Sequence, residues 1–329
     1  MDIDIKYDSS TLKNYKLVQP GDFIISLRSF QGGFETSYLT GITSPAYTIF
    51  NFIDNQSQNH MFWQYLFKRK NFINSLKKVT FGIRDGKAIS FSQFGDVKVE
   101  YPDFDEQKHI AITLNKIDDT IQLHERKCEE LALIKKALLQ KLFSKKDEIK
   151  PEVRYKNFSD AWEQRKLGEV IVSEHKGKVK SSMKGGNTNY LETNYLNGGT
   201  AQKVDAIADV SKDDVLILWD GSKAGTIYHG FEGALGSTLK AYVPKYSGDF
   251  LYQILKKNQD KIYQSYRTPN IPHVIKNFTE KFNVSIPTII EQQEIGDFFK
   301  QLDSLITLHQ RKLERLKQLK KFLLQNMFI

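Results

Sequence analysis

The chain has 329 residues, a formal net charge of +9 at pH 7 and a single cysteine, Cys128. Its length is enough for two domains with separate cores, and its charge favours a polyanionic partner such as nucleic acid. One cysteine excludes an intramolecular disulfide and a cysteine-rich zinc cluster. An apolar run long enough to span a membrane and a signal-peptide pattern are both absent, so we expect a cytoplasmic protein with no membrane role.

Residues 1–101 carry the pattern of a mixed α/β domain. The segment 20–26 (PGDFIIS) predicts a strand, and 60–76 predicts an amphipathic helix. Both have counterparts in the same order in the second half of the chain, at offsets near 185 to 192. About forty residues at the front of the second copy have no counterpart in the first, so we expect the first domain to be N-terminally incomplete.

Residues 102–146 predict one long helix. Pro102 is followed by Asp103 and Glu106, the spacing of a capping box. Apolar residues then recur mostly at alternating intervals of four and three, the pattern of a coiled-coil seam. The predicted seam consists of Ile110, Leu114, Ile117, Ile121, His124, Cys128, Leu131, Ile134, Leu138 and Leu142. At 1.5 Å per residue this helix reaches roughly 60 Å, so it needs a partner to bury the seam.

A second mixed α/β domain is predicted at 154–286, after a charged linker at 147–153. Strands are expected at 215–221 and 239–244, and a helix at 250–266.

Residues 287–329 predict a second long helix that repeats the first. Between 101–144 and 286–329, 18 of 44 positions are identical, where chance would give about three, which indicates an internal duplication. The second seam is Ile295, Phe299, Leu302, Ile306, His309, Leu313, Leu316, Leu319, Leu323 and Met327. We expect the two helices to pack as an antiparallel pair, with His124 and His309 as polar seam residues rather than metal ligands and Cys128 as a small apolar one.

Domain order and short motifs together resemble the specificity (S) subunit of type I restriction-modification systems. The motifs are Arg154–Phe158, Trp162–Gly168, Glu291–Gln292 and Ile306–Lys312. The resemblance implies an α/β (α+β) fold class: two mixed α/β target recognition domains joined by two long antiparallel helices that form a coiled-coil spacer. It departs at the front, because family members usually begin with their own Trp-x-x-x-x-Leu-Gly motif. We therefore expect the first domain to bind its half-site poorly unless a second S chain supplies an intact domain.

The function that the resemblance implies is a non-catalytic DNA-specificity subunit that recognises a bipartite target. Its implied partners are double-stranded DNA, two modification (methyltransferase) subunits, restriction/translocase subunits through the complex, and a second S chain. No cofactor is expected on this chain, because the methyltransferase and ATP-dependent endonuclease activities belong to the partner subunits.

Candidate DNA-binding residues are cations, amides and an aromatic residue on predicted loops, which can reach phosphates and base edges. In the second domain they are Lys176, Lys178, Lys180, Lys184, Asn187, Asn189, Tyr190, Lys223, Arg267 and Asn270. In the first domain they are Arg28, Gln31, Lys77, Lys78 and Arg84.

Two other classes of protein remain as alternatives. One is a coiled-coil adaptor whose globular ends bind proteins, and the other is a self-sufficient nuclease. Pro102-Asp103 with Glu106-x-Lys108 superficially resembles a nuclease site, but two residues cannot separate carboxylates that must converge on one metal from different strands. Helix capping is the better interpretation of that motif.

Overall fold

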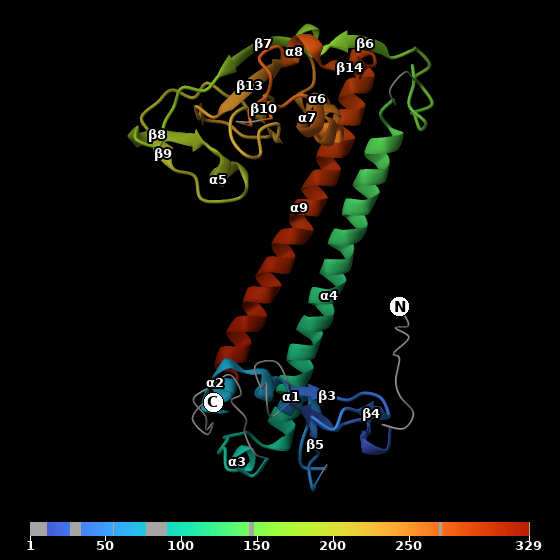
Figure 1. The fold of residues 1–329 in the computed structure, drawn as a ribbon, viewed down its shortest axis with the longest axis vertical. Helices are drawn as coiled ribbons and strands as arrows, with labels where there is room; N and C mark the ends of the chain where they lie inside the picture. The colour runs from blue at the N-terminus through green and yellow to red at the C-terminus, as the bar shows by residue number, and fades with distance from the viewer. Residues whose placement is uncertain are drawn as a thin grey trace. The chain divides into compact units, whose positions relative to one another are not determined.

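The computed structural model describes residues 12–26, 34–54, 56–76, 91–144, 148–269 and 272–328. The chain forms two units: unit 1 contains residues 1–126 and 310–329, and unit 2 contains residues 127–309. Both units mix helices with β-sheets, and each of the two long helices contributes residues to both units (Figure 1). The expected fold class is therefore confirmed. Among the helices in the described ranges, none combines the length and apolar character that crossing a membrane would need.

Unit 1 has an antiparallel sheet in the order β3-β2-β5, and helix α1 packs against β3. Its strands are β1 (Lys16–Val18), β2 (Phe23–Ile25), β3 (Phe34–Thr36), β4 (Gly41–Thr43) and β5 (Thr48–Phe50), and β1 pairs with β4. Its helices are η1 (Leu12–Asn14), α1 (His60–Lys68), α2 (Lys70–Leu76) and α3 (Phe91–Gly95). The core is rich in aromatic rings: Phe23 lies against Phe50 and Phe67 at ring distances of 5.4 and 5.3 Å.

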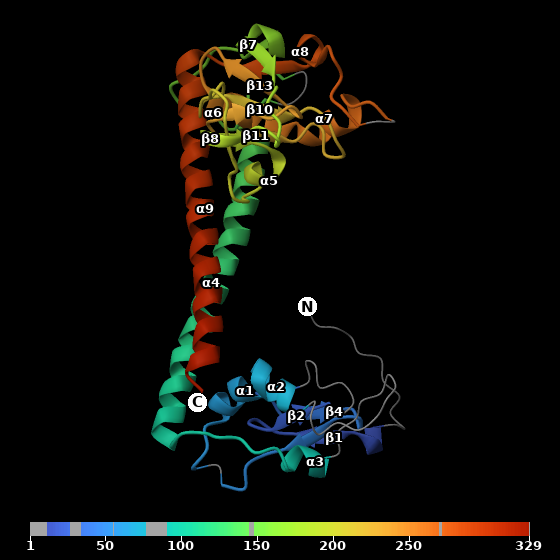
Figure 2. The ribbon, with the colours of Figure 1, turned by 90° about the vertical axis from the view of Figure 1, so that its left-hand side faces the viewer.

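Unit 2 is built on a four-stranded antiparallel sheet in the order β11-β10-β13-β7. Its strands are β6 (Glu163–Lys166), β7 (Ile171–Lys176), β8 (Lys184–Leu191), β9 (Lys203–Val204), β10 (Val215–Leu218), β11 (Ile227–His229), β12 (Ala234–Leu235), β13 (Leu239–Pro244) and β14 (Asn283–Ile286). Its short helices are η3 (Leu167–Glu169), α5 (Thr193–Leu196), α6 (Gly248–Lys257), α7 (Gln259–Ser265) and α8 (Phe278–Lys281). Figure 2 shows β7, β10 and β13 of this sheet with α6 and α7 nearby. Helix α6 contacts β10, β11 and β13.

The predicted strands and helices of the two domains are present, with one difference. Strand β2 and strand β10 occupy equivalent places, each paired on both sides. Each predicted domain helix is instead two helices, α1 with α2 and α6 with α7, divided at Arg69 and Asn258. The break at Asn258 is stabilised by the side-chain amide of Asn258, which donates to the Ile254 carbonyl at 2.8 Å. An asparagine amide that bonds the local backbone in this way competes with helix continuation.

The long helices are α4 (Phe104–Lys141) and α9 (Ile289–Asn326). In unit 1, Lys320 of α9 pairs with Asp118 of α4, and Lys317 pairs with Glu125 at 2.8 Å. In unit 2, Lys135 of α4 pairs with Asp303 of α9 at 2.6 Å. Partners fall along α9 as they rise along α4 in unit 1, and in unit 2 Phe143, just after α4, lies against Phe299 of α9 at a ring distance of 5.9 Å, so the helices are antiparallel in both units, as expected.

Two of the predicted seam positions are wrong. Ile134 and Leu319 are exposed, at 48% and 45%. In their places the neighbouring Lys135 and Lys320 turn inward, with side chains 17% and 29% exposed. The stem of a lysine can cover apolar surface while its ammonium reaches a carboxylate, here Asp303 or Asp118.

The N-terminus of each long helix is organised by the Pro-x-x-x-Glu-Gln motif. The side-chain amides of Gln107 and Gln292 donate to the carbonyls of Pro102 and Pro287, both at 2.9 Å. Asp103 accepts from the backbone of Glu106 at 2.9 Å, which confirms it as a capping residue.

Candidate nucleic-acid interface

Four loops of unit 2 meet at one end of the four-stranded sheet. The loops are residues 177–183 after β7, 219–225 after β10, 236–238 before β13 and 266–273 after α7. We call their described residues the loop rim; residues 270 and 271 lie outside the described ranges. Backbone bonds join neighbouring loops: Ser237 donates to Val179 at 3.0 Å, Trp219 to Thr238 at 2.8 Å, and Gly221 to Pro272 at 2.9 Å. Candidate segments that are far apart in the sequence therefore lie in one continuous surface.

The loop after β7 alternates buried and exposed residues. Gly177 and Val179 are buried, whereas Lys178 and Lys180 are exposed. A Cβ at Gly177 would lie 2.1 Å from the Gly236 carbonyl oxygen, so only glycine permits this approach of the two backbones. Val179 packs with Tyr190 and Val204 in a small hydrophobic cluster. Because the small and apolar residues anchor the loop, its lysines must point to solvent.

Four candidate lysines have unneutralised charges: Lys178, Lys180, Lys184 and Lys223. All four are exposed, and no carboxylate within the described ranges lies within ion-pair distance of any of them. Exposed ammonium groups of this kind can contact phosphates with sequence-independent, salt-sensitive affinity.

Lys176 and Arg267 have structural partners instead. Lys176 pairs with Asp220 at 2.7 Å, which ties β7 to the loop after β10. The Arg267 guanidinium donates to the Ser222 and Ala224 carbonyls at 3.2 and 3.4 Å and lies 5.2 Å from the Tyr263 ring centroid. These two cations shape the loop around Lys223.

The polar residues on β8 fall into two groups. The side chain of Lys203 donates to the Asn187 carbonyl at 3.0 Å and to Oδ1 of Asn189 at 2.8 Å, which orders the strand after the bulge at Gly185 and Gly186. Tyr190 is only 8% exposed, and burial raises the pKa of its phenol above the usual 10.0. Its side chain belongs to the core cluster, so we leave Tyr190 out of the proposed interface.

Several candidates lie outside the described residues. These are Asn270 in unit 2 and Arg28, Gln31, Lys77, Lys78 and Arg84 in unit 1.

Sequence reasoning missed two lysines that position this surface. Lys203 orders β8 as described, and Lys240 of β13 lies 4.4 Å from the Trp219 ring centroid while it pairs with Glu174 at 2.7 Å. Neither lysine stands in a basic stretch, and Lys240 falls inside the predicted strand 239–244, so the sequence did not mark them as part of this surface.

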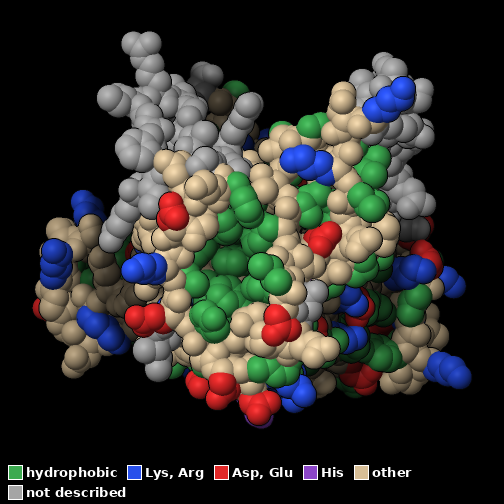
Figure 3. Space-filling view, turned by 90° about the horizontal axis from the view of Figure 1, so that it is seen from below, with side chains coloured by type: hydrophobic (Ala, Val, Ile, Leu, Met, Phe, Trp, Pro, Cys, Tyr) green, Lys and Arg blue, Asp and Glu red, His purple; other side chains and the backbone are tan. Residues whose placement is uncertain are grey.

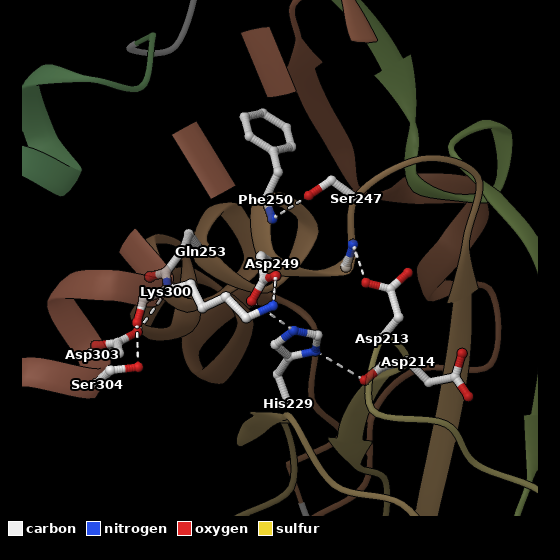
Figure 4. A network of polar contacts seen from close by, with 11 residues as sticks. Asp213, Asp214, His229, Ser247, Asp249, Phe250, Gln253, Lys300, Asp303 and Ser304 are labelled. Carbon is white, nitrogen blue, oxygen red and sulfur yellow. Dashed lines mark hydrogen bonds and ion pairs between the residues drawn. The ribbon is translucent and has the colours of Figure 1, made fainter. Parts of the chain in front are cut away.

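A polar cluster links α6, β11 and α9 inside unit 2 (Figure 4). Ligand atoms of Asp213, His229 and Asp249 lie within 4.8 Å of one another, a spacing that could hold a metal ion. Each is already bonded to protein: Asp213 accepts from the Gly248 backbone, His229 contacts Asp249 at 3.1 Å, and Lys300 pairs with Asp249 at 2.8 Å. These bonds account for the cluster as a structural link between α9 and the start of α6.

A family model described as the type I restriction modification DNA specificity domain matches residues 5–133 and 159–318. The match covers most of the sequence in two segments, and the chain belongs to this family. The second segment contains the loop rim, and each segment contains most of one long helix.

Two curated relatives come from Methanocaldococcus jannaschii. The type I restriction enzyme MjaVIII specificity subunit is 30% identical over 194 residues, which are 56% of this chain and 45% of that protein. The putative type I restriction enzyme MjaX specificity subunit is 22% identical over 286 residues, or 78% of this chain and 63% of that protein. The matched part thus spans less than two thirds of the length of each relative.

Two solved structures share the fold. The S subunit of a type I restriction-modification system from M. genitalium aligns over 95% of this chain and 84% of its own, with a TM-score of 0.71 and 18% identity. A chain from a structure concerning complex assembly and conformational transition of the type I R-M system aligns over 95% and 83%, with a TM-score of 0.54 and 14% identity.

Proposed function

We propose that this chain is the DNA-specificity subunit of a cytoplasmic type I restriction-modification complex and that it recognises a bipartite target. Unit 2 reads one half of the target. The N-terminally incomplete first domain reads the other half poorly unless a second S chain supplies an intact domain, and the paired helices α4 and α9 form the spacer between the two readers. The observation that carries the proposal is the loop rim with its exposed, unneutralised Lys178, Lys180 and Lys223, and Lys184 on the adjoining β8. Phosphate contacts from such groups fix the register in which neighbouring amides and hydroxyls meet base edges.

The chain acts by binding and leaves the chemistry to its partners. Two modification subunits supply methyl transfer, and restriction/translocase subunits join through the complex. The relatives named as specificity subunits support this division of roles. The polar cluster at Asp249 needs no reaction to explain it, because each of its groups has a structural partner.

The test is salt-dependent binding to duplex DNA by the chain assembled with its modification subunits. We expect the logarithm of the binding constant to fall linearly with the logarithm of salt concentration, and methylation to require a sequence in two specified parts. Binding that does not respond to salt, or assembly with proteins but not DNA, favours the adaptor alternative. Magnesium-dependent cleavage by the isolated chain favours the nuclease alternative.

A further inference from the structure

Strands β8 and β9 of unit 2 form an antiparallel pair whose register shifts at a bulge. Two residues of β8 that are four positions apart both lie opposite Val204, so the three residues between them, 185–187, stand outside the ladder. A Cβ at Gly186 would lie 2.5 Å from the Val204 carbonyl oxygen, so only glycine lets the chain bend this closely. The bulge leaves the Asn187 carbonyl free of the ladder, and the Lys203 ammonium donates to it at 3.0 Å.

Lys203 also determines which way the side-chain amide of Asn189 faces. The two residues lie directly opposite each other in the ladder, and the Lys203 ammonium donates to Oδ1 of Asn189 at 2.8 Å. An ammonium group has three donors and no acceptor, so only the oxygen of the amide can face it. The amide nitrogen of Asn189, with its two N–H donors, is therefore turned away from Lys203.

After these contacts the two side chains have only donors left to offer. Lys203 uses two of its three N–H groups on Asn187 and Asn189, and no carboxylate of the described ranges lies within ion-pair distance of it. The N–H groups of the Asn189 amide bond to no acceptor within those ranges, and Lys203 is exposed while Asn189 is partly exposed. We call Lys203 and Asn189 the donor pair. It suits a ligand that presents two neighbouring acceptors.

The donor pair is joined to the loop that carries Lys178 and Lys180. Val179 of this loop packs with Val204, the neighbour of Lys203, in one small hydrophobic cluster. The backbone N–H after Val204 also donates to the carbonyl of the last loop residue at 3.1 Å. Phosphate contacts by the loop lysines would therefore hold the donor pair close to the same stretch of duplex. The face shown in Figure 3 differs, because acidic side chains lie around its apolar area and a phosphate there would meet like charge.

We propose, on the basis of the proposed DNA-specificity function, that the donor pair reads a guanine in the half of the target that unit 2 recognises. In the major groove guanine presents two neighbouring acceptors, N7 and O6, whereas adenine presents an acceptor beside a donor. A free asparagine amide suits adenine, because its nitrogen donates to N7 while its oxygen accepts from the amino group. The oxygen of Asn189 is held by a cation that repels an approaching donor. The Asn189 amide and the Lys203 ammonium together match guanine instead.

The test uses the chain assembled with its modification subunits and the duplex target found by methylation mapping. Each guanine of the target is replaced in turn by 7-deazaguanine, which lacks the N7 acceptor and keeps its base pairing. We expect one replacement to weaken binding of the wild type by about fivefold or more, and to leave binding of the Lys203→Met, Asn189→Ala chain unchanged. Lys276→Met with Asn283→Ala, an exposed lysine and asparagine elsewhere in unit 2, is the matched control and keeps the wild-type response.

Lys203→Met alone provides a second measurement, because it frees the Asn189 oxygen to accept from a base. Replacing the same guanine by adenine, with thymine opposite, should then cost this variant about tenfold less affinity than it costs the wild type. Unaltered discrimination between guanine and adenine overturns the assignment.

The outcomes separate this assignment from the function on which it rests. Salt-dependent binding in which the wild type and the Lys203→Met, Asn189→Ala chain respond alike to every 7-deazaguanine overturns the role of the donor pair and leaves the specificity function standing. A target half without guanine on either strand does the same. Wild-type complexes without salt-dependent DNA binding overturn both.

Discussion

Glu291 is a fully buried carboxylate, and its charge is tolerated because Arg154 donates to both of its oxygens. The same bonds raise the pKa of the Arg154 guanidinium above its usual value. Removing one member of a buried ion pair leaves the other charge uncompensated and costs about 3–5 kcal/mol, whereas apolar replacement of both costs less.

Glu291→Gln should therefore destabilise unit 2 by about 3–5 kcal/mol, and the double variant Arg154→Met with Glu291→Leu by less. Unfolding in urea is followed by tryptophan fluorescence in a Trp63→Phe background, so that only Trp162 and Trp219, both in unit 2, report. If the double variant is the less stable of the two, the buried pair contributes net stability and this expectation is wrong.

Asp249 makes the stability of unit 2 sensitive to acid. Burial raises the pKa of Asp249, but the bonds from His229 and Lys300 outweigh burial and hold the pKa below its usual 3.8. A carboxyl group whose pKa is lower in the folded state than in the unfolded state stabilises the fold at pH values above its unfolded-state pKa. This stabilisation is lost as the pH falls through its folded-state pKa.

The stability difference between the wild type and Asp249→Asn should accordingly stay constant at neutral pH and shrink as pH falls below about 3.8. Urea unfolding midpoints measured from pH 7 to pH 3 check this expectation. A difference that stays constant down to pH 3 would show that Asp249 does not keep its charge through these contacts.

Lys178 and Lys180 offer the sharpest test of the DNA surface. Reversing both to Glu should weaken DNA binding and lower the salt slope by about one for each lost phosphate contact. Lys276→Glu with Lys281→Glu, exposed lysines beside and on α8, is the matched control. Unchanged affinity and slope in the first pair would remove this loop from the interface.

Residue type and spacing in the sequence identified the exposed lysines of the loop rim and β8, but they did not indicate which cations would be paired with other groups of the protein. The basic stretch 176–184 is visible in the sequence, and its four lysines are indeed exposed. That Lys176 is neutralised depends on Asp220, 44 positions away, and the carbonyls that hold Arg267 are at least 43 positions away. Contacts over such separations are set by the sheet, which local pattern does not describe.

At the scale of elements, the duplicated helices carry a duplicated contact. Lys135 with Asp303 and Lys320 with Asp118 are the same two positions, 185 residues apart. In each unit a tyrosine of the adjacent domain helix also contacts the lysine. The Nζ atom of Lys135 lies 5.8 Å from the ring centroid of Tyr252, and that of Lys320 lies 5.6 Å from the ring centroid of Tyr65. Burial and the charge of Asp303 raise the pKa of Tyr252 to about 12. One contact thus fixes helix to helix and helix to domain in both units.

In the two long helices, the four-three spacing predicts which residues face the partner helix better than the apolar character of the residues does. Continuing the strict four-three alternation beyond Leu131 and Leu316 leads to Lys135 and Lys320, which are the residues that turn inward. Choosing the nearest apolar residue instead led to the wrong positions. Helix geometry fixes which face meets the partner, and a long polar side chain can adapt to that face.

Aspartate at Leu131 and Leu316 should therefore lower the melting temperature of the chain by several degrees, because a charge enters the seam. The paired control, Ile134→Asp with Leu319→Asp, should leave it nearly unchanged, since both side chains are exposed. Differential scanning calorimetry of the two double variants compares them directly. Equal melting temperatures would contradict the shifted seam.

At the scale of the whole molecule, each of the two units has its own main core, and the loop rim of unit 2 is described except for residues 270 and 271. The duplication and the element order were predictable, because identity between the copies is high in the long helices. The loops that distinguish the domains have diverged, so the sequence could not indicate how each is folded.

Substitution of Asn187 and Asn189 should alter at most one half of the methylated sequence. Both residues lie in unit 2, which has its own core, so the other half of the target is read without them. Methylation mapping in a host that carries the modification subunits and either chain compares the two patterns. A change in both halves would show that the units do not read DNA independently.

Phe328 gives the molecule an unusual order of completion. Its ring stacks on Phe62 at 5.1 Å, and its carbonyl accepts from Arg69 at 2.9 Å, so a residue near the end of the chain fills the core of the unit that begins it. Residues 310–328, which belong to unit 1, follow all of unit 2 in the sequence and are translated after it. Unit 1 is thus begun before unit 2 but receives its last core residues after it, and a premature stop codon shortly before Phe328 leaves unit 2 with its full contiguous sequence while opening the core of unit 1.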